Sequence, residues 1–600
     1  MKNKGRKQTV AGFARGSIGM LTLAALGSLV SIGFSFLTPQ IIRLTVDNVI
    51  GSEPADTLPA LLMGLLGGRE TLRERLVLCG AAIAVTAALG GVFNGLGRVC
   101  VTRGTEKFSL RLRDALLRHV QALPYSWLGE NRTGDIIQRC TADVETLHRF
   151  VSEQLIEVVR TVLLLAAALG IMFGMNGTLA LVFAASVPVI VGYSLFFYRR
   201  IGRQFLYADE CEGELLTDVQ ENLTAVRVVR AFGREKQELE KFDRIGAKYI
   251  DSWVRMGYTM GLFWGMGDMA VCLQMLAILC VGTLLVARGE TSLGVLLAFI
   301  SYTHTLASPV RQMGRSLSEM SKAKVSAARL QEILDAEPER DEPDASDVFP
   351  DGDIVFENVC FSYGGQEVLR DVSFRLPRGG TLGVLGATGS GKSTLTLLLT
   401  RLEEPDKGRI TIGGRDIRTL RRDCLRRHVA LVMQEPFLFS ETIRENITAA
   451  APDCAEEDMR RCARYAAVDE DILSFAEGYD TVVGERGVTL SGGQRQRVAI
   501  ARALAAQSPV LVLDDAMSAV DMQTDQRIRQ GLREAAGERT VLLISHRVST
   551  LMEADRILVL EDGRVTECGT HRELMELGGH YARVCRIQES AAAAEGGQTA

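Results

Sequence analysis

The sequence predicts an α-helical membrane bundle with six transmembrane helices, followed by an α/β domain that contains a P-loop. Three observations lead to this fold class. Six apolar stretches precede residue 315, each close to the roughly 20 residues that cross a bilayer. An acidic, proline-containing linker follows at residues 331–350, and beyond it the chain changes to short β-like runs. One of these runs leads into the glycine-rich segment GATGSGKST at residues 386–394.

The overall composition argues against several classes of protein. Apolar residues make up 47% of the chain, charged residues 24%, and the formal net charge is -5. No block of basic residues alternates with aromatic ones, so we expect no nucleic-acid partner. The 12 cysteines are scattered singly without a CxxC pair, which argues against a disulfide framework or a zinc site.

The membrane half consists of six apolar stretches. They begin at Ile18, Arg75, Leu155, Thr178, Met260 and Ser292. Two connections between them are about 55 to 60 residues long and have a helical pattern. We therefore expect four of the six spans to continue as helices well beyond the bilayer.

The distribution of basic residues predicts the orientation of the spans. Lysine and arginine crowd the segment before the first span and the connections at residues 98–118 and 198–204. The connections at residues 51–70, 176–177 and 288–291 carry few of them. Because cytoplasmic connections are enriched in basic residues, both termini and the two long connections are expected in the cytoplasm.

Four polar residues lie within the apolar stretches. They are Arg160, Asp268, Gln274 and His304. Lipid tolerates such side chains poorly, so we expect them to face the interior of the bundle or a water-filled cavity. Hydrogen bonding between helices and contact with a transported substrate both fit this pattern.

The soluble half carries a phosphate-binding signature. Residues 386–394 follow an apolar run and precede a helical pattern, which is the strand, loop and helix context of a P-loop. In such a loop Gly386, Ala387, Thr388, Gly389, Ser390, Gly391 and Thr394 surround the phosphates. Lys392 supplies a positive charge to the phosphates and Ser393 a hydroxyl to Mg²⁺. Asp514, at the end of the apolar run VLVLD, is expected to bind the same magnesium ion.

The segment LSGGQRQRVAIARAL at residues 490–504 identifies the class of nucleotide hydrolase. It lies about 20 residues before Asp514, and with it nearly the whole chain resembles the ATP-binding cassette (ABC) transporters. The resemblance implies ATP and Mg²⁺ as ligands, and it divides the chain at residues 1–330, 331–350, 351–588 and 589–600. These ranges are the membrane domain, the linker, the ATP-binding cassette and a flexible tail.

The same resemblance assigns roles to residues of the cassette. Tyr363 is similar to the aromatic residue that stacks on adenine, and Gln434 to the glutamine that reaches Mg²⁺ and the attacking water. His546 is similar to the histidine that holds the γ-phosphate. The signature residues Ser491, Gly492, Gly493 and Gln494 would contact ATP held by the P-loop of a second cassette. Residues 484–487 resemble a stretch that meets the cytoplasmic hairpins, and Asp521 resembles a loop that crosses to the other monomer.

One cassette and six spans imply a half-transporter that must dimerise in the bilayer. Residues 125–147 and 221–242 resemble the cytoplasmic coupling regions of exporter-type half-transporters. The domain order fits the multidrug and lipid exporter type, so the resemblance implies outward transport of an amphipathic compound. It also implies a bacterial inner membrane with a cytoplasmic cassette.

Asp515 departs from the pattern of fast cassettes, which carry glutamate after the magnesium aspartate. Three interpretations are open: a slow base in a homodimer, a shifted backbone that compensates, or the degenerate site of a heterodimer. We favour the heterodimer, because the signature is intact while the base is shortened. Its partner would be a different half-transporter with glutamate at this position. An exporter-fold uptake system and a gated channel are the alternatives in function.

Overall fold

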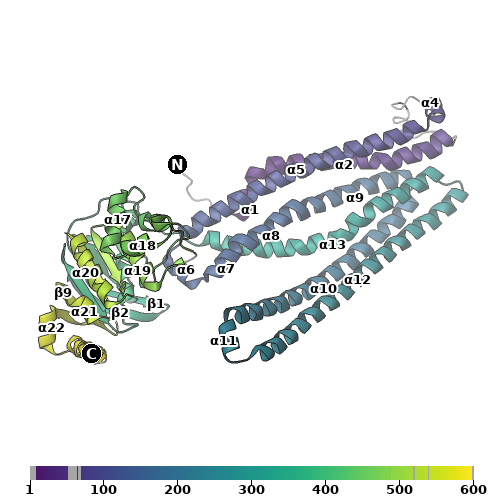
Figure 1. Ribbon diagram of the computed structural model, residues 1–600. Coiled ribbons are helices and arrows are strands. Elements are labelled where there is room, and N and C mark those ends of the chain that lie inside the picture. Colours follow the sequence, from purple (N-terminus) through teal and green to yellow (C-terminus); the bar gives the residue numbers. More distant parts are fainter. Residues whose placement is uncertain are drawn as a thin grey trace. The chain divides into compact units, whose positions relative to one another are not determined.

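The computed structural model describes residues 9–51, 64, 69–484, 487–517, 520–537 and 539–596 (Figure 1). Most of the predicted connection at residues 51–70, and Glu485 and Arg486 of the segment 484–487, lie outside these residues. The chain forms two compact units. One contains residues 1–122 and 131–337, and the other contains residues 123–130 and 338–600.

The first unit is helical. Its principal helices are α1 (Val10–Phe13), α2 (Ile18–Leu44), α4 (Arg69–Glu74), α5 (Val77–Gln121), α7 (Thr133–Gln138), α8 (Val144–Arg149), α9 (Ile156–Met175), α10 (Gly177–Thr224), α11 (Val226–Ala231), α12 (Glu235–Ala287) and α13 (Leu293–Asp335). π-Helical turns follow α2 at Thr45–Ile50, α7 at Arg139–Asp143 and α8 at Phe150–Leu155. In the described part of the chain, six helical segments are long and apolar enough to cross a membrane. The six predicted spans are confirmed.

Four spans extend far beyond the thickness of a bilayer. The four helical segments that flank the two long connections are α5, Thr133–Met175, α10 and α12, and they contain 45, 43, 48 and 53 residues. A span needs only about 20, so the expectation that four of them continue as helices is confirmed. Figure 1 shows α10 and α12 running side by side to the turn at α11, and the two helices pack along their length.

Small residues bring α2 and α5 into close contact. A Cβ atom added at Gly97 would lie 3.4 Å from the carbonyl oxygen of Ala24, and one added at Gly27 would lie 3.3 Å from that of Phe93. The Ser31 hydroxyl donates a hydrogen bond to the Gly90 carbonyl at 2.9 Å. Lipid supplies no hydrophobic force between spans, so close backbone packing and such hydrogen bonds hold these two helices together.

The polar residues of the spans have different surroundings. Asp268 on α12 is 70% exposed and forms an ion pair with Arg311 of α13, with Nη1 and Oδ1 2.6 Å apart. Gln274 is buried, whereas His304 is exposed at the surface of this single chain. Helix α9 brings Arg160 into a polar cavity that is described below. The Asp268 pair shows one way in which the bundle accommodates charge.

The second unit is an α/β domain with two sheets, which confirms the predicted fold class. An antiparallel sheet has the order β2–β1–β4–β5, and a mostly parallel sheet has the order β10–β9–β3–β8–β7–β6. The strands are β1 (Ile354–Tyr363), β2 (Gln366–Leu376), β3 (Thr381–Gly386), β4 (Lys407–Ile412), β5 (Arg415–Asp416), β6 (Val429–Val432), β7 (Val510–Asp514), β8 (Thr540–Ile544), β9 (Arg556–Glu561) and β10 (Arg564–Gly569).

Helices cover the parallel sheet and form the rest of the domain. They are α6 (Tyr125–Glu130), α14 (Lys392–Leu399), α15 (Arg422–His428), α16 (Ile443–Thr448), α17 (Glu456–Tyr465), α18 (Asp469–Ser474), α19 (Gly492–Ala505), α20 (Met522–Ala536), α21 (Val548–Leu551), α22 (His571–Leu577) and α23 (His580–Gly596). Helix α23 includes residues 589–596, where the sequence predicts the start of a tail. Residues 597–600 lie outside the described part.

Both faces of the parallel sheet are buried. Along β7, Leu511 and Leu513 enter one hydrophobic core, whereas Val510 and Val512 enter the other. Strand β8 alternates in the same way. A parallel sheet covered on both faces reads as a continuous apolar run, which explains the run before Asp514.

A buried carboxylate joins the end of the first span to the start of the last. Asp47 accepts a hydrogen bond from the Ser292 hydroxyl and one at 2.8 Å from the backbone N–H of Gly294. These groups lie at the N-terminus of α13, where free N–H groups favour a negative charge. Asp47 therefore caps a helix that is distant in sequence.

Replacing Asp47 by alanine should destabilise the membrane unit by about 1–3 kcal/mol, since the Gly294 N–H loses its partner in a buried place. The melting temperature of the purified protein in detergent, followed by intrinsic fluorescence, measures this. Glu290→Ala is the control, because Glu290 is exposed close to the same helix end. Equal melting temperatures for Asp47→Ala and Glu290→Ala would contradict the capping role.

Candidate nucleotide-binding site

The parallel sheet brings the predicted nucleotide residues to one edge. Strands β3, β8, β7 and β6 are parallel neighbours, so their carboxyl ends lie together. The P-loop follows β3, His546 follows β8, Asp514 ends β7 and Gln434 follows β6. Ligands of open α/β sheets bind at this edge, and four segments that are distant in sequence meet there.

The backbone of the P-loop adopts positive φ angles, which favour glycine. Gly389 and Gly391 have φ angles of 83° and 100°. A Cβ atom on Gly391 would come within 2.6 Å of the Leu369 side chain, and one on Gly386 within 2.5 Å of the Leu560 carbonyl oxygen. These glycines let the loop turn tightly into α14, whose first residue is Lys392. Ala387 and Thr388 are exposed at the mouth of the loop.

The amine of Lys392 is held by the loop. Its Nζ donates hydrogen bonds of 2.8 Å to the carbonyl oxygens of Gly386 and Ala387. Only 7% of the residue is exposed. Burial lowers the pKa of Lys392, and the charges of Asp514 and Asp515 oppose this shift. The loop therefore fixes the position of the ammonium group.

Asp514 faces the P-loop from the neighbouring part of the sheet. Burial raises its pKa, the hydrogen bond from Ser393 lowers it, and the negative charge of Asp515 raises it further. Lys392 and His546 favour its charged form through their electrostatic interaction. A hydroxyl and a carboxylate in contact are oxygen ligands of the kind that Mg²⁺ prefers.

Asp515 has a left-handed backbone conformation with a φ of 46°. Its N–H donates to the Ile544 carbonyl at 2.9 Å, and its own carbonyl accepts a long hydrogen bond of 3.5 Å from Gln496 Nε2. The side chain is buried, with 8% of the residue exposed. Both backbone groups of Asp515 are thus tied to neighbouring elements.

The signature segment forms the beginning of α19. The Ser491 hydroxyl accepts a hydrogen bond from the Gln494 N–H, and the Gln494 side chain accepts one from the Ser491 N–H, which is a capping box. Gly492 and Gly493 complete the first turn. Among the described residues, no hydrogen bond or ion pair joins 491–494 to the P-loop at 386–394.

Tyr363 ends β1 and is 41% exposed. Its ring packs edge-on against Phe361, with centroids 4.7 Å apart. Burial raises the pKa of Tyr363, and a hydrogen bond from Thr394 lowers it. The aromatic ring therefore lies beside the last residue of the P-loop.

Two glutamines that sequence reasoning missed hold the loops of the site. Gln496 Nε2 donates to the carbonyls of Gln434, at 3.4 Å, and Asp515. Gln588 on α23 donates to the His546 carbonyl at 2.7 Å and accepts from the Val548 N–H at 2.9 Å. Gln496 belongs to the signature segment at residues 490–504, so the sequence did contain a motif that points to it. Gln588 belongs to no motif and could be found only from the structure.

The arrangement fits a nucleotide. The Ser390 hydroxyl is buried and has no hydrogen-bond partner among the described residues, so a phosphate oxygen would satisfy it. The N-terminus of α14 and the Lys392 ammonium provide positive charge. Fold and site together define a membrane protein with a P-loop nucleotide-binding domain.

Comparison with known proteins agrees with this class. A model of the ABC transporter transmembrane region matches residues 21–310, and a model of the ABC transporter domain matches residues 369–518. The ABC transporter ATP-binding protein YknU of Bacillus subtilis is 35% identical over 567 residues, which cover 94% of each chain. An ATP-dependent lipid A-core flippase of Desulfotalea psychrophila is 34% identical over 486 residues, covering 80% of this chain and 84% of its own.

A solved structure extends the comparison to three dimensions. The structure of a bacterial Atm1-family ABC exporter with ATP bound is 27% identical, with a TM-score of 0.77, and the match covers 96% of this chain and 99% of the other. The chain belongs to the ABC transporters. It is an integral membrane protein of the exporter type, with a cassette that is an ATPase domain and a fold that implies a dimer.

Replacing Gly391 by alanine should weaken ATP binding at least about tenfold, because the side chain strains the left-handed backbone and displaces the loop N–H groups. Titration with a fluorescent ATP analogue measures the affinity. Gly414→Ala is the control: its φ is 76°, but a Cβ atom there meets nothing within 4 Å. Unchanged nucleotide affinity in Gly391→Ala would contradict the role of the loop geometry.

Proposed function

We propose that this chain is the degenerate-site subunit of a heterodimeric exporter, which moves amphipathic small molecules, drugs or lipids outward at the expense of ATP. The cassette and both termini lie on the cytoplasmic side of a bacterial inner membrane. The observation that carries the proposal is the combination of Asp515, which is one methylene shorter than the glutamate of fast cassettes, with an intact capping box at Ser491. The exporter and flippase names of the relatives support the direction of transport and the amphipathic substrate.

The residues of the site have distinct roles in this proposal. Tyr363 stacks on adenine, and the backbone N–H groups of 387–391 bind the phosphates. Lys392 neutralises the β- and γ-phosphates. When bound, Mg²⁺ supplies further positive charge to the phosphates, and Ser393, Gln434 and Asp514 would hold it. His546 contacts the γ-phosphate, and its loop is fixed by Gln588.

The shortened side chain sets the rate. Asp515 lacks one methylene relative to glutamate, so its carboxylate is drawn back from the attacking water. A displacement of about 1 Å can cost on the order of a hundredfold in rate. The backbone of Asp515 is fixed by Ile544, and this supports a loss of reach over a compensating backbone shift.

Closure of the dimer then requires the signature of this chain at the partner's nucleotide. Ser491 and Gly493 lie at the N-terminus of α19, where N–H groups and the helix dipole favour a phosphate. The partner, a half-transporter with glutamate after its magnesium aspartate, holds the faster site. ATP binding closes the cassettes and turns the membrane cavity outward, and hydrolysis resets them.

Replacing Asp515 by glutamate should raise kcat for ATP hydrolysis by the purified chain, on the order of a hundredfold, since the carboxylate regains its reach. Release of labelled phosphate measures the rate. Asp515→Asn should change the low starting rate little. Co-purification with a glutamate-bearing half-transporter should give fast hydrolysis without any substitution. A fast homodimer that Asp515→Asn abolishes would contradict the degenerate site.

Replacing Gln588 by alanine should lower kcat of the purified chain about tenfold and leave KM for ATP nearly unchanged, because Gln588 positions the His546 loop without contacting nucleotide. Gln588→Glu retains only the acceptor for Val548 and should be intermediate. Arg583→Ala, an exposed change on the same helix, is the control. If Arg583→Ala changed KM or kcat as much as Gln588→Ala does, the effect would be a general one on α23, and the positioning role of Gln588 would be contradicted.

A further inference from the structure

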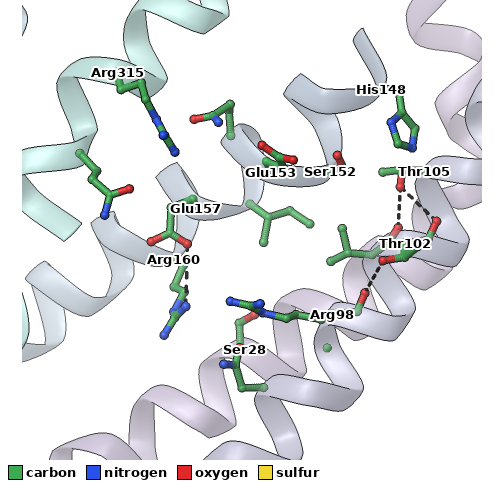
Figure 2. A pocket seen from close by; sticks show the side chains of 16 residues that line it. Ser28, Arg98, Thr102, Thr105, His148, Ser152, Glu153, Glu157, Arg160 and Arg315 are labelled. Carbon is green, nitrogen blue, oxygen red and sulfur yellow. Dashed lines mark hydrogen bonds and ion pairs between the residues drawn. The ribbon is translucent and has the colours of Figure 1, made fainter. Parts of the chain in front are cut away.

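The membrane unit contains a polar cavity of about 620 Å³ (Figure 2). Its walls come from α2, α5, α8, α9, α13 and the π-helical turn before α9. Its charged lining consists of Arg98, Arg160, Arg315, Glu153 and Glu157. Figure 2 shows that the three arginines extend from three different helices. Charged side chains in such a bundle are costly and mark functional sites.

Arg98 and Arg315 lie at the depth of one layer of lipid headgroups. Successive spans cross in opposite directions, so Val77, Met175 and Leu293 belong to the same end of the bundle. At 1.5 Å per residue, α5 rises about 32 Å from Val77 to Arg98, and α13 rises about 33 Å from Leu293 to Arg315. The hydrocarbon core of a bilayer is about 30 Å thick. Arg98 and Arg315 therefore lie at its opposite boundary.

Arg160 lies deeper than the other two arginines. It precedes Met175 by about 22 Å of helix, so it is within the hydrocarbon layer. Its partner is Glu157 on the same helix, with Nη1 and Oε2 3.8 Å apart. This distance is long for an ion pair, but the negative charge of Glu157 still balances the positive charge of Arg160.

The remaining charges of the cavity are not balanced. Among the described residues, no ion pair holds Arg98, Arg315 or Glu153. His148 also lines the cavity, but its ring lies 3.4 Å from Glu106 and 3.8 Å from Glu145, which are carboxylates outside the lining. Two positive charges and one negative charge remain, an excess of one positive charge.

We propose that this cavity binds the headgroup of a membrane lipid that carries one net negative charge, such as a phosphodiester with a neutral alcohol. The inference rests on the proposed export of amphipathic compounds and names the substrate class. One phosphodiester neutralises the excess charge, and the guanidinium groups of Arg98 and Arg315 donate charge-assisted hydrogen bonds to it. Its acyl chains reach the apolar part of the spans.

The charge of Glu153 predicts the direction in which lipid affinity changes when this residue is neutralised. Its carboxylate repels an anionic headgroup, but it would attract the ammonium group of a zwitterionic one. Neutralising Glu153 therefore strengthens binding of an anionic lipid and weakens binding of a zwitterionic lipid. Neutralising Arg98 or Arg315, in contrast, weakens binding of an anionic lipid.

The test measures lipid binding to the full-length chain in neutral detergent, without nucleotide. The probe is phosphatidylglycerol with a fluorescent label on an acyl chain, and the readout is anisotropy. Phosphatidylethanolamine and diacylglycerol should compete at least about tenfold more weakly than unlabelled phosphatidylglycerol. Arg98→Gln and Arg315→Gln should each weaken binding about tenfold. Glu153→Gln should strengthen it roughly threefold.

Matched controls separate charge in the cavity from charge elsewhere. Arg103 on α5 and Glu210 on α10 are exposed and do not line the cavity. Arg103→Gln and Glu210→Gln should leave the affinity within about twofold of the original, since screened surface charges contribute little. Glycerophosphoglycerol, the same headgroup without acyl chains, should fail to compete at matched concentration.

Several results would overturn the inference. Equal binding of the three lipids, weaker binding in Glu153→Gln, or unchanged binding in Arg98→Gln and Arg315→Gln would each do so. Competition by glycerophosphoglycerol as strong as that by the lipid would exclude a membrane source. ATP hydrolysis by the same preparation tests the proposed function independently, because the binding assay contains no nucleotide.

Discussion

The structure of the cassette depends on collecting buried charges of opposite sign at one edge of a parallel sheet. Lys392, Asp514 and Asp515 are each less than one-tenth exposed. Any one of them alone would be costly to bury, because desolvation penalises the charged form. The attraction of Lys392 to the two carboxylates offsets part of this cost only if β3 and β7 lie on either side of β8. The sheet order, the glycines of the P-loop and the two cores on the sheet faces all serve this arrangement.

In the membrane unit, too, several charged and polar side chains have a partner of opposite charge or a hydrogen-bond partner. Arg311 is paired with Asp268, Gln40 donates to the Tyr302 hydroxyl at 2.9 Å, and Asp47 caps the N-terminus of α13. These groups are satisfied by the protein and hold helices together. Arg98, Arg315 and Glu153 line the cavity without an ion-pair partner in the described part of the chain, so a ligand that pairs with the two arginines would lower the free energy. Pairing thus separates structural polar residues from those that are free to bind.

Much of the fold could be predicted from the sequence, because its signals are local. Continuous apolar runs mark both the spans and a strand such as β7, and the glycines of 386–394 mark a backbone that other residues disfavour. Gln588 could not be predicted, since its role depends on α23 packing beside a loop some 40 residues earlier. Asp47 likewise looks like an ordinary residue after an apolar run. Its function as a cap arises only when the first and last spans come together.

Asp515 shows how a local backbone constraint bears on catalysis. Its φ of 46° lies in a region where aspartate and asparagine are several-fold enriched over other residues that carry a side chain. Aspartate therefore fits this turn with little strain, and its N–H and carbonyl keep their bonds to Ile544 and Gln496. In the heterodimer that we propose, such a site would keep Lys392 and Asp514 for nucleotide binding and have a base of shorter reach, which is the property required of a subunit that holds ATP while its partner hydrolyses it.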